Sequence, residues 1–318
     1  MKQNLELYLS MLRIRRVEEA IAARYSQQKM RCPTHLSIGQ EAVAVGVCSA
    51  LDKSDKVYSS HRAHAHYLAK GGDLNMLLAE LYGKKDGCTQ GRGGSMHLCD
   101  LSAGFMASTA IVANSIPIAV GHALHFKSQG LPYIAVAFFG EGATEEGAFY
   151  EALNFAVVKS LPILFVCENN RYSVYSPLSV RQPQGRSIVN MVSAMGIEAH
   201  EVDGNNVAEV FEQVSTIKRQ MVTQAKPVLI ECHTYRHREH CGPSEDDDLG
   251  YRPQHEVDHW LGRDPLNIGI EMLGIDTNST HFLAASAHMN TEIEDAFSFA
   301  ESSDFPDPAT NHEYLYAE

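Results

Sequence analysis

The sequence predicts an α/β fold in which a mainly parallel sheet is flanked by helices. Three apolar runs, 133–139, 163–167 and 227–232, are expected to be strands, and a further strand is expected at 197–202. Continuous apolar sequence is typical of strands that helices cover on both faces. Helical patterns lie between the runs, and a strand–helix–strand crossover joins parallel strands in nearly every known case. With 318 residues, the chain is long enough for one large domain or two smaller ones.

Helical spacing and capping residues predict the other elements. Leucine, valine and isoleucine at helical spacing predict a first helix over 5–21, and Asp73 is expected to cap a helix over 73–82. Further helices are expected over 116–126, over 207–221 and through most of 268–305.

The crossover between the first two long strands is expected to be a helix over 145–159, capped by Thr144. Its buried face would hold Ala148, Ala152, Phe155 and Ala156. Two stretches, 83–108 and 170–186, show little periodicity, and loops of such length in a compact domain usually have a function.

The composition is that of an acidic globular chain. The net charge is −13, 44% of residues are hydrophobic, and there is no basic stripe of the kind that nucleic-acid binders carry. Neither a signal peptide nor an apolar stretch of about eighteen residues, long enough to span a membrane, is visible. The seven cysteines include no Cys-x-x-Cys pair, which favours reduced thiols over a disulfide framework. We therefore expect a cytoplasmic protein that binds neither nucleic acid nor membranes.

Two short motifs carry the first chemical signal. Gly140-Glu141-Gly142 and Asn169-Asn170 each follow an apolar strand, on either side of the crossover helix. Open α/β sheets bind ligands outside the carboxyl ends of their strands. A carboxylate and an amide oxygen suit Mg²⁺, which commonly takes one or two protein ligands and completes its shell with phosphate oxygens. The pair predicts a Mg²⁺–diphosphate site, although either motif alone also suits an ordinary turn.

Two histidine-rich segments lie outside the predicted strands. The first is 61–66, and the second, 233–240, begins where the strand at 227–232 ends. Arg236 and His240 are therefore expected near the same sheet edge, where an arginine fork matches phosphate oxygens and a histidine can carry a proton. His61, His64 and His66 also have ligand-like spacing for zinc, but no carboxylate or cysteine stands in register with them. A surface or packing role remains open for each histidine taken alone.

In their order along the chain, these motifs resemble the alpha subunits of the thiamine-diphosphate-dependent 2-oxo-acid dehydrogenases, the family of the pyruvate, branched-chain and acetoin dehydrogenases. The resemblance covers nearly the whole chain. It implies a thiamine-diphosphate-binding fold, formed as a single domain over residues 1–318 with an N-terminal helix and a C-terminal helical tail. The motifs that carry it include His61-Arg62-Ala63-His64, Gly91-Arg92-Gly93-Gly94-Ser95, Glu168-Asn169-Asn170-Arg171-Tyr172, Thr234-Tyr235-Arg236 and Phe305-Pro306-Asp307-Pro308.

The resemblance also implies roles for individual residues. Glu141, Asn170 and the backbone carbonyl of Tyr172 would hold Mg²⁺ against the diphosphate of thiamine diphosphate. Val112 would support the cofactor from below. His64 and His240 are the expected catalytic side chains, with His64 near the reacting carbon. The full set expected to bind the cofactor is His61, Arg62, Ala110, Val112, Gly140, Glu141, Gly142, Ala143, Asn170, Tyr172, Arg236 and His240.

Two positions depart from the family pattern. The usual motif is Gly-Asp-Gly, so the carboxylate of Glu141 stands one methylene further from the backbone, and we expect metal binding to survive with a shifted geometry. Cys241 stands where many relatives have a serine that is phosphorylated in mitochondrial members, so regulation at that position is not expected.

The resemblance implies partners as well. In this family the glutamate that activates the cofactor belongs to a separate beta subunit, so we expect an oxidoreductase of two alpha and two beta subunits. It would cleave the bond next to a ketone carbon of a 2-oxo acid or acetoin and pass the acyl group to a lipoyl acyltransferase. Two alternatives stay open. One is a thiamine-dependent decarboxylase or carboligase of a specialised pathway without a lipoyl partner, and the other is a non-catalytic cofactor-binding scaffold.

Overall fold

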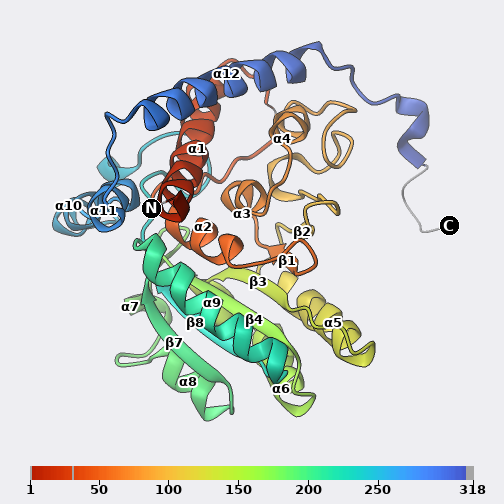
Figure 1. Ribbon diagram of the computed structural model, residues 1–318, viewed down its shortest axis with the longest axis vertical. Helices are drawn as coiled ribbons and strands as arrows, with labels where there is room; N and C mark the ends of the chain where they lie inside the picture. Colours follow the sequence, from red (N-terminus) through yellow and green to blue (C-terminus); the bar gives the residue numbers. More distant parts are fainter. Residues whose placement is uncertain (1, 31, 313–318) are drawn as a thin grey trace.

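The computed structural model describes residues 2–30 and 32–312, and within them a parallel sheet forms the centre of the molecule (Figure 1). All neighbouring strands of this sheet pair in parallel, and β3 pairs directly with β4. The predicted α/β class with a parallel sheet is therefore confirmed. The order of the six strands is β2 (Phe105–Ser108), β1 (Lys56–Ser59), β3 (Ala135–Gly140), β4 (Ile163–Asn169), β8 (Val228–His233) and β7 (Glu198–Asp203).

Two apolar layers, one on each face, bury the sheet. Successive residues of β3 alternate between them, so that Val136 and Phe138 face one layer while Ala137 and Phe139 face the other. The first layer contains α1 (Lys2–Tyr25), α2 (Glu41–Ser49), α3 (His64–Ala69), α4 (Leu74–Leu81), α9 (Val207–Thr223) and α12 (Thr280–Ser302). The second contains α5 (Ser115–Ser128), α6 (Gly147–Val158) and α8 (Ile188–Ala194).

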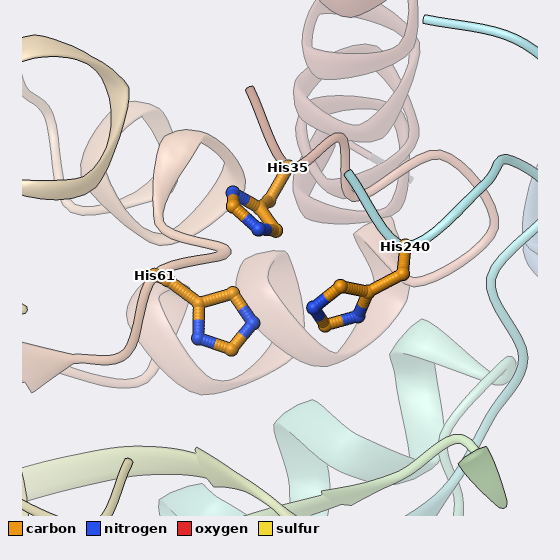
Figure 2. A group of neighbouring side chains, drawn as sticks. All are labelled: His35, His61 and His240. Atoms are coloured by element: carbon orange, nitrogen blue, oxygen red, sulfur yellow. The ribbon is translucent and has the colours of Figure 1, made fainter. Parts of the chain in front are cut away.

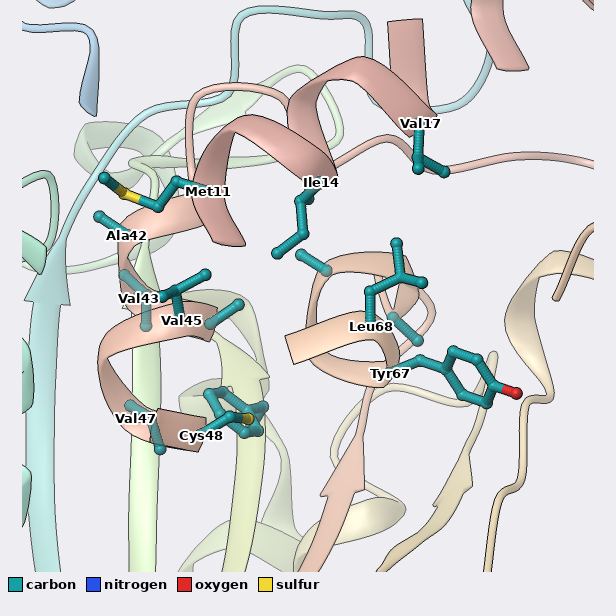
Figure 3. Packing of buried hydrophobic residues seen from close by; sticks show 14 of the residues in the cluster. Met11, Ile14, Val17, Ala42, Val43, Val45, Val47, Cys48, Tyr67 and Leu68 are labelled. Atoms are coloured by element: carbon teal, nitrogen blue, oxygen red, sulfur yellow. The ribbon is translucent and has the colours of Figure 1, made fainter. Parts of the chain in front are cut away.

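In the first layer, α1 packs against α2 and α3. Figure 3 shows Met11 and Ile14 of α1 above Val45 of α2, with Leu68 of α3 beside them. Burying an aliphatic side chain of this size is worth about 1.5–3 kcal/mol. One carboxylate, Glu18, lies among these side chains and accepts hydrogen bonds from the backbone amide of Ser37 at 2.8 and 2.9 Å. The first helix therefore also fixes the segment that leads into α2.

The predicted helices are present, with small shifts at their ends. Asp73 caps α4 as expected, because its carboxylate accepts from the backbone amide of Met76 at 2.9 Å. The helical tail consists of α11 (Pro265–Leu273) and α12, preceded by α10 (Gln254–Leu261), and α12 runs along α1 and α4 (Figure 1). No helix in the described part of the chain is long and apolar enough to cross a membrane.

The prediction for the crossover was wrong in two details. Thr144 is not a helix cap, because a short 3₁₀ helix, Glu141–Glu145, precedes α6, and the Thr144 hydroxyl donates to the Glu141 carbonyl at 2.7 Å. Ala152 and Ala156 of the predicted face are buried, but Phe155 is 40% exposed, and Phe149 and Leu153 fill the core in its place.

The irregular stretches contain short elements that the sequence did not predict. β2 ends the stretch 83–108, and β1 precedes the first histidine-rich segment; each has four residues, too few for a periodic pattern. The stretch 170–186 contains the hairpin of β5 (Tyr172–Ser173) and β6 (Ser176–Pro177), followed by the single turn α7 (Leu178–Arg181).

Candidate functional site

A cavity opens at the carboxyl ends of β1, β3 and β4. The chain leaves β1 for the outer strand β2 and returns on the other side of β1 as β3, so the strand order reverses there. Such reversals are where open α/β sheets form ligand sites. The cavity is lined by Gln40, Ser60, His61, Arg62, Val112, Ala113, Phe139, Gly140, Glu141, Gly142, Ala143, Glu168, Asn170, Tyr172, Ser173 and His240.

One side of the cavity, the oxygen wall, consists of Glu141 and Asn170. Gly140, the last residue of β3, pairs with Glu168 of β4, so Glu141 and Asn170 leave adjacent strand ends about 4.8 Å apart. The Asn170 amide group donates to Gln40 at 3.0 Å, which turns its oxygen toward the Tyr172 amide, 3.3 Å away. The predicted pair of motifs is thus brought together.

Glu141 is buried, with 2% of its surface exposed, and a cation already lies against it. Arg181 of α7 donates to the Glu141 carboxylate and to Glu145, and it also donates to the Ser176 carbonyl at 2.9 Å. Burial raises the pKa of Glu141, and the Arg181 guanidinium opposes that rise. A buried carboxylate with a positive charge at its oxygens, next to an amide oxygen, fits a Mg²⁺ site in its choice of donors.

The backbone around the oxygen wall has space for a ligand and holds unusual conformations. A Cβ atom at Gly142 would lie 3.0 Å from the Ser173 hydroxyl, so glycine keeps this side of the cavity open. Three nearby residues other than glycine have positive φ angles: Ala113 at 63°, Arg171 at 75° and Val174 at 56°. Such conformations cost of order 1–3 kcal/mol each and concentrate at functional sites. Val112, beside Ala113, presents an apolar side chain that is 48% exposed.

A group of three histidines, which we call the histidine wall, consists of His35, His61 and His240, whose rings converge from three separate segments (Figure 2). His61 and His240 line the cavity, and His35 packs against both rings. The ring centroids are 4.6 Å apart for His35 and His61, 5.1 Å for His35 and His240, and 5.3 Å for His61 and His240. Burial lowers the pKa of His35 to about 2, of His61 to about 4 and of His240 to about 3, and the Arg62 charge adds to each shift. All three imidazoles are therefore neutral at pH 7.

Arg62 holds the histidine wall together. Its guanidinium donates to the Leu36 carbonyl and, at 3.1 Å, to the His240 carbonyl, so it links the segments that carry His35 and His240. A parallel backbone bridge between His35 and Gly242 reinforces this link, with the Gly242 amide donating to Thr34 at 2.8 Å. Burial lowers the pKa of Arg62 to about 10, which leaves it charged at pH 7.

Three predicted site residues do not line the cavity. His64 is buried behind it, with Nε2 2.7 Å from the Ser95 hydroxyl and Nδ1 3.4 Å from Glu18. Arg236 is 1% exposed, and its guanidinium donates to Asp246, to Tyr251 and to the carbonyls of Arg238 and Val174. Ala110 lies outside the lining, with its amide 3.4 Å from His97.

The zinc ligand set considered from spacing alone, His61, His64 and His66, is not assembled. His66 bonds the Ser59 hydroxyl at 2.8 Å through Nδ1, and its Nε2 lies 3.3 Å from Glu168, whereas His64 contacts Ser95 and Glu18. His66 therefore supports the ends of β1 and β4, and His64 links α1 to the glycine-rich segment, so the two rings do not share a ligand.

Three residues of the site were not singled out from the sequence. His35 and Gln40 lie in the segment before α2, which has no strand or helix pattern, and Glu168 was recognised only as part of a family motif. The available signal was the run His35-Leu36-Ser37-Ile38-Gly39-Gln40-Glu41, which places four polar residues around a glycine. Gly39 has a φ of 97°, a conformation that requires glycine in a close turn.

Comparison with known proteins identifies relatives over nearly the whole chain. A family model described as dehydrogenase E1 component matches residues 9–309. The alpha subunit of acetoin:2,6-dichlorophenolindophenol oxidoreductase from Bacillus subtilis (strain 168) is 35% identical over 301 residues, which cover 94% of this chain and 89% of the relative. The alpha subunit of the pyruvate dehydrogenase E1 component from Porphyra purpurea is 36% identical over 323 residues, covering 99% of this chain and 93% of the relative.

Among solved structures, a transketolase from Leishmania mexicana has a similar fold. The TM-score is 0.56 at 17% sequence identity, and the match covers 92% of this chain. This chain corresponds to 46% of the transketolase chain, so the likeness concerns the fold of that part alone.

Proposed function

The chain belongs to the dehydrogenase E1 component family, and we propose that it is the alpha subunit of a thiamine-diphosphate-dependent 2-oxo-acid or acetoin dehydrogenase. The observation that carries the proposal is the oxygen wall. A buried carboxylate and an amide oxygen leave adjacent strand ends and face one cavity, which also contains an arginine and an exposed valine. Residues 1–318 would act as one cofactor-binding domain.

Each lining residue has a proposed part in holding the cofactor. Mg²⁺ would be held by Glu141, Asn170 and the Tyr172 carbonyl. Arg62, His61 and His240 would contact the diphosphate, together with the backbone of 140–143. Val112 would support the cofactor from below, and the main chain at Ala110 would bind its aminopyrimidine at the edge of the cavity.

When bound, thiamine diphosphate supplies the carbanion that attacks a ketone carbon and accepts the electron pair of the bond that breaks. The chain supplies the surroundings. His240 is neutral at pH 7 because burial lowers its pKa to about 3, so its ring would donate one hydrogen bond to the diphosphate and keep a free ring nitrogen as a hydrogen-bond acceptor for the reaction. Phe139 and Val112 contribute apolar surface that keeps part of the cavity dry.

His64 and Arg236 act through other residues in this scheme. Arg236 donates at 2.6 Å to the carbonyl of Arg238, two residues before His240, so we assign it the positioning of that segment. His64 lies between Glu18 and Ser95 and positions the glycine-rich segment that contains Ser95. The catalytic role expected for His64 is therefore replaced by a positioning role in this proposal.

The partners follow from the relatives. Both named relatives are alpha subunits, which supports a beta subunit as partner. We propose two copies of each chain in the assembly. A lipoyl acyltransferase would accept the acyl group. The cysteines are all free thiols, in keeping with the reducing environment of the cytoplasm. Glu141, in place of the family aspartate, keeps a second candidate open: a thiamine-dependent decarboxylase or carboligase with no lipoyl partner.

The oxygen wall can be tested in the complex of this chain with its beta subunit. Glu141→Ala is expected to weaken Mg²⁺-dependent binding of thiamine diphosphate by about 100-fold or more, because groups behind metal ligands already change affinity by about 10–100-fold. Isothermal titration calorimetry measures the loss. Glu145→Ala is the matched control, since Glu145 is exposed and shares Arg181 with Glu141, and its affinity should stay within about threefold of wild type. Unchanged affinity in Glu141→Ala would reject the site, and a wild-type complex that binds no cofactor would favour the scaffold.

A further inference from the structure

The histidine wall offers a chemistry beyond the cofactor contacts that we propose for His61 and His240. Three imidazoles from three separate segments place one ring nitrogen each within 4.8 Å of the other two. We propose that His35, His61 and His240 form a binding site for a divalent transition metal such as Zn²⁺, and that metal bound there excludes thiamine diphosphate from the cavity. The metal site itself does not depend on the proposed function.

The spacing of the nitrogens is close to that of a three-histidine metal site. Zn–N bonds are about 2.0–2.1 Å long, so the nitrogens of a tetrahedral site lie about 3.4 Å apart. A span of up to 4.8 Å reaches that value by small rotations of the His61 and His240 side chains, which are only partly buried. Three protein ligands leave a fourth position, and it would face the cavity that His61 and His240 line.

The ligands are in the correct protonation state before metal arrives. Metal binds the neutral imidazole, and burial together with the Arg62 charge keeps the pKa of each ring far below 7. His35 is 6% exposed, and its Nδ1 is buried with no hydrogen-bond partner. A buried polar atom without a partner costs about 1–3 kcal/mol, so this ring gains by acquiring a ligand.

The surrounding contacts preorganise the three rings. Arg62 donates to the carbonyls of Leu36 and His240, and the backbone bridge of His35 with Gly242 holds the same two segments together. Preorganised ligands lose less conformational entropy on binding, which is how outer contacts raise metal affinity.

The local charge does not exclude a dication. Arg62 and Arg236 are the opposing cations. Glu18 and Glu168 act on the Arg62 guanidinium and raise its pKa against the effect of burial, and Asp246 acts on His240 against the effect of the two arginines. Glu168 also lines the cavity. Nitrogen ligands favour Zn²⁺, Ni²⁺ and Cu²⁺, whereas Mg²⁺ favours oxygen ligands, so the two walls would select different metals.

The first experiment uses the metal alone. Titration of ZnCl₂ into the purified chain, followed by calorimetry, is expected to show about one site per chain, and Co²⁺ should give the visible absorption of a four-coordinate ion. His35→Asn should weaken Zn²⁺ binding by about tenfold or more. His233→Asn is the matched control, because His233 lies in the other group of possible ligands, with Glu201 and Glu231. Loss in His233→Asn with none in His35→Asn would overturn the proposal.

A second variant and a competition assay keep the test decisive if His35→Asn does not fold. His61→Asn, at a partly exposed position, should weaken Zn²⁺ binding similarly, and Cys241→Ser should not. Loss of Zn²⁺ binding in Cys241→Ser alone would assign the metal to the thiol and contradict the proposal.

In the complex with the beta subunit, Zn²⁺ should weaken binding of thiamine diphosphate about tenfold in wild type and have no effect in His35→Asn. Equal inhibition of both proteins would overturn the exclusion of cofactor. A failure of cofactor binding without Zn²⁺ would count against the proposed function and leave the calorimetric result for the metal standing.

Discussion

The oxygen wall and the histidine wall face the same cavity, but they are built in different ways. Glu141 and Asn170 follow adjacent strands, so the sheet itself sets their separation. His35, His61 and His240 come from three connecting segments, which are held by one guanidinium and one backbone bridge. The first wall inherits the rigidity of the core, whereas the second depends on a few polar contacts. The second should therefore be the easier of the two to disrupt without unfolding the protein.

The two walls also differ in how burial is compensated. Burial pushes Glu141 and the three histidines alike toward their neutral forms, raising the pKa of the acid and lowering those of the bases. Glu141 has an ion-pair partner in Arg181, which favours its charged form. Positive charge from Arg62 lies beside the histidines, and the opposing effect of Asp246 on His240 is smaller, so all three remain neutral. The oxygen wall thus offers ligands that suit a cation such as Mg²⁺. The histidine wall offers neutral nitrogens, which suit a transition metal.

A substitution at Gly39 should affect both walls at once. Gly39 lies between His35 of the histidine wall and Gln40, which accepts a hydrogen bond from Asn170. Its φ is 97°, and a Cβ there would lie 2.4 Å from the Tyr235 carbonyl oxygen. Gly39→Ala should therefore disturb both walls and lower the free energy of unfolding by about 3 kcal/mol, from a positive φ and a backbone clash together. Urea denaturation measures this change.

Gly71→Ala is the matched control for Gly39→Ala. Gly71 has a φ of 99°, yet a Cβ there would meet nothing within 4 Å. Only the cost of placing alanine at a positive φ should remain, which lowers the free energy of unfolding by about 1–2 kcal/mol. Equal losses in the two variants would show that the contact with Tyr235 does not constrain the segment between the walls.

Elements with a local sequence pattern were predicted, whereas elements fixed by distant contacts were not. Long apolar strands such as β3 and β4 were predicted because their continuous pattern reflects burial on both faces. β1 and β2, with four residues each, leave no such pattern and are fixed by pairing with distant neighbours. Thr144 was wrongly expected to cap a helix, because a hydroxyl can satisfy a 3₁₀ turn as well as a helix start.

Within the site, the oxygen wall was predicted and the histidine wall only in part. Motifs at strand ends point to a sheet edge, which is why Glu141 and Asn170 were identified together. His35 is separated by 205 positions from His240, and no local pattern relates them; their meeting depends on the Arg62 hydrogen bonds. Arg236 was expected to contact the ligand. Its guanidinium instead donates to Asp246, ten residues further along the chain.

A fall in pH should affect the histidine wall, because the fold keeps the His35 imidazole neutral. The pKa of His35 is about 2 in the folded chain and about 6.5 when unfolded, so the unfolded chain takes up the proton as pH falls below 6.5. The stability due to neutral His35 is present above that pH and is lost progressively below it, by about 2 kcal/mol at pH 5.

Urea denaturation at pH 7 and pH 5 measures this loss. The wild-type chain should lose more stability between these pH values than His35→Asn, which has no proton to gain, by about 2 kcal/mol. His125→Asn, which removes an imidazole from α5 on the other face of the sheet, is the control and should behave as wild type. An equal loss in wild type and His35→Asn would mean that His35 is not kept neutral by the fold.

The smallest effect is expected at Arg181. It tests whether the Arg181 guanidinium occupies the place at Glu141 that the metal would take. Mg²⁺ must displace the guanidinium from Glu141, so Arg181→Gln should raise the affinity for metal by about tenfold, which corresponds to about 1.4 kcal/mol. Electron paramagnetic resonance titration with Mn²⁺, carried out at the same pH for both proteins, measures this. Arg186→Gln is the control, because Arg186 belongs to the same stretch but bonds Tyr150. Weaker binding in Arg181→Gln would mean that the arginine and the metal act together on the same ligand, and that the oxygen wall, like the histidine wall, depends on a loop contact as well as on the sheet.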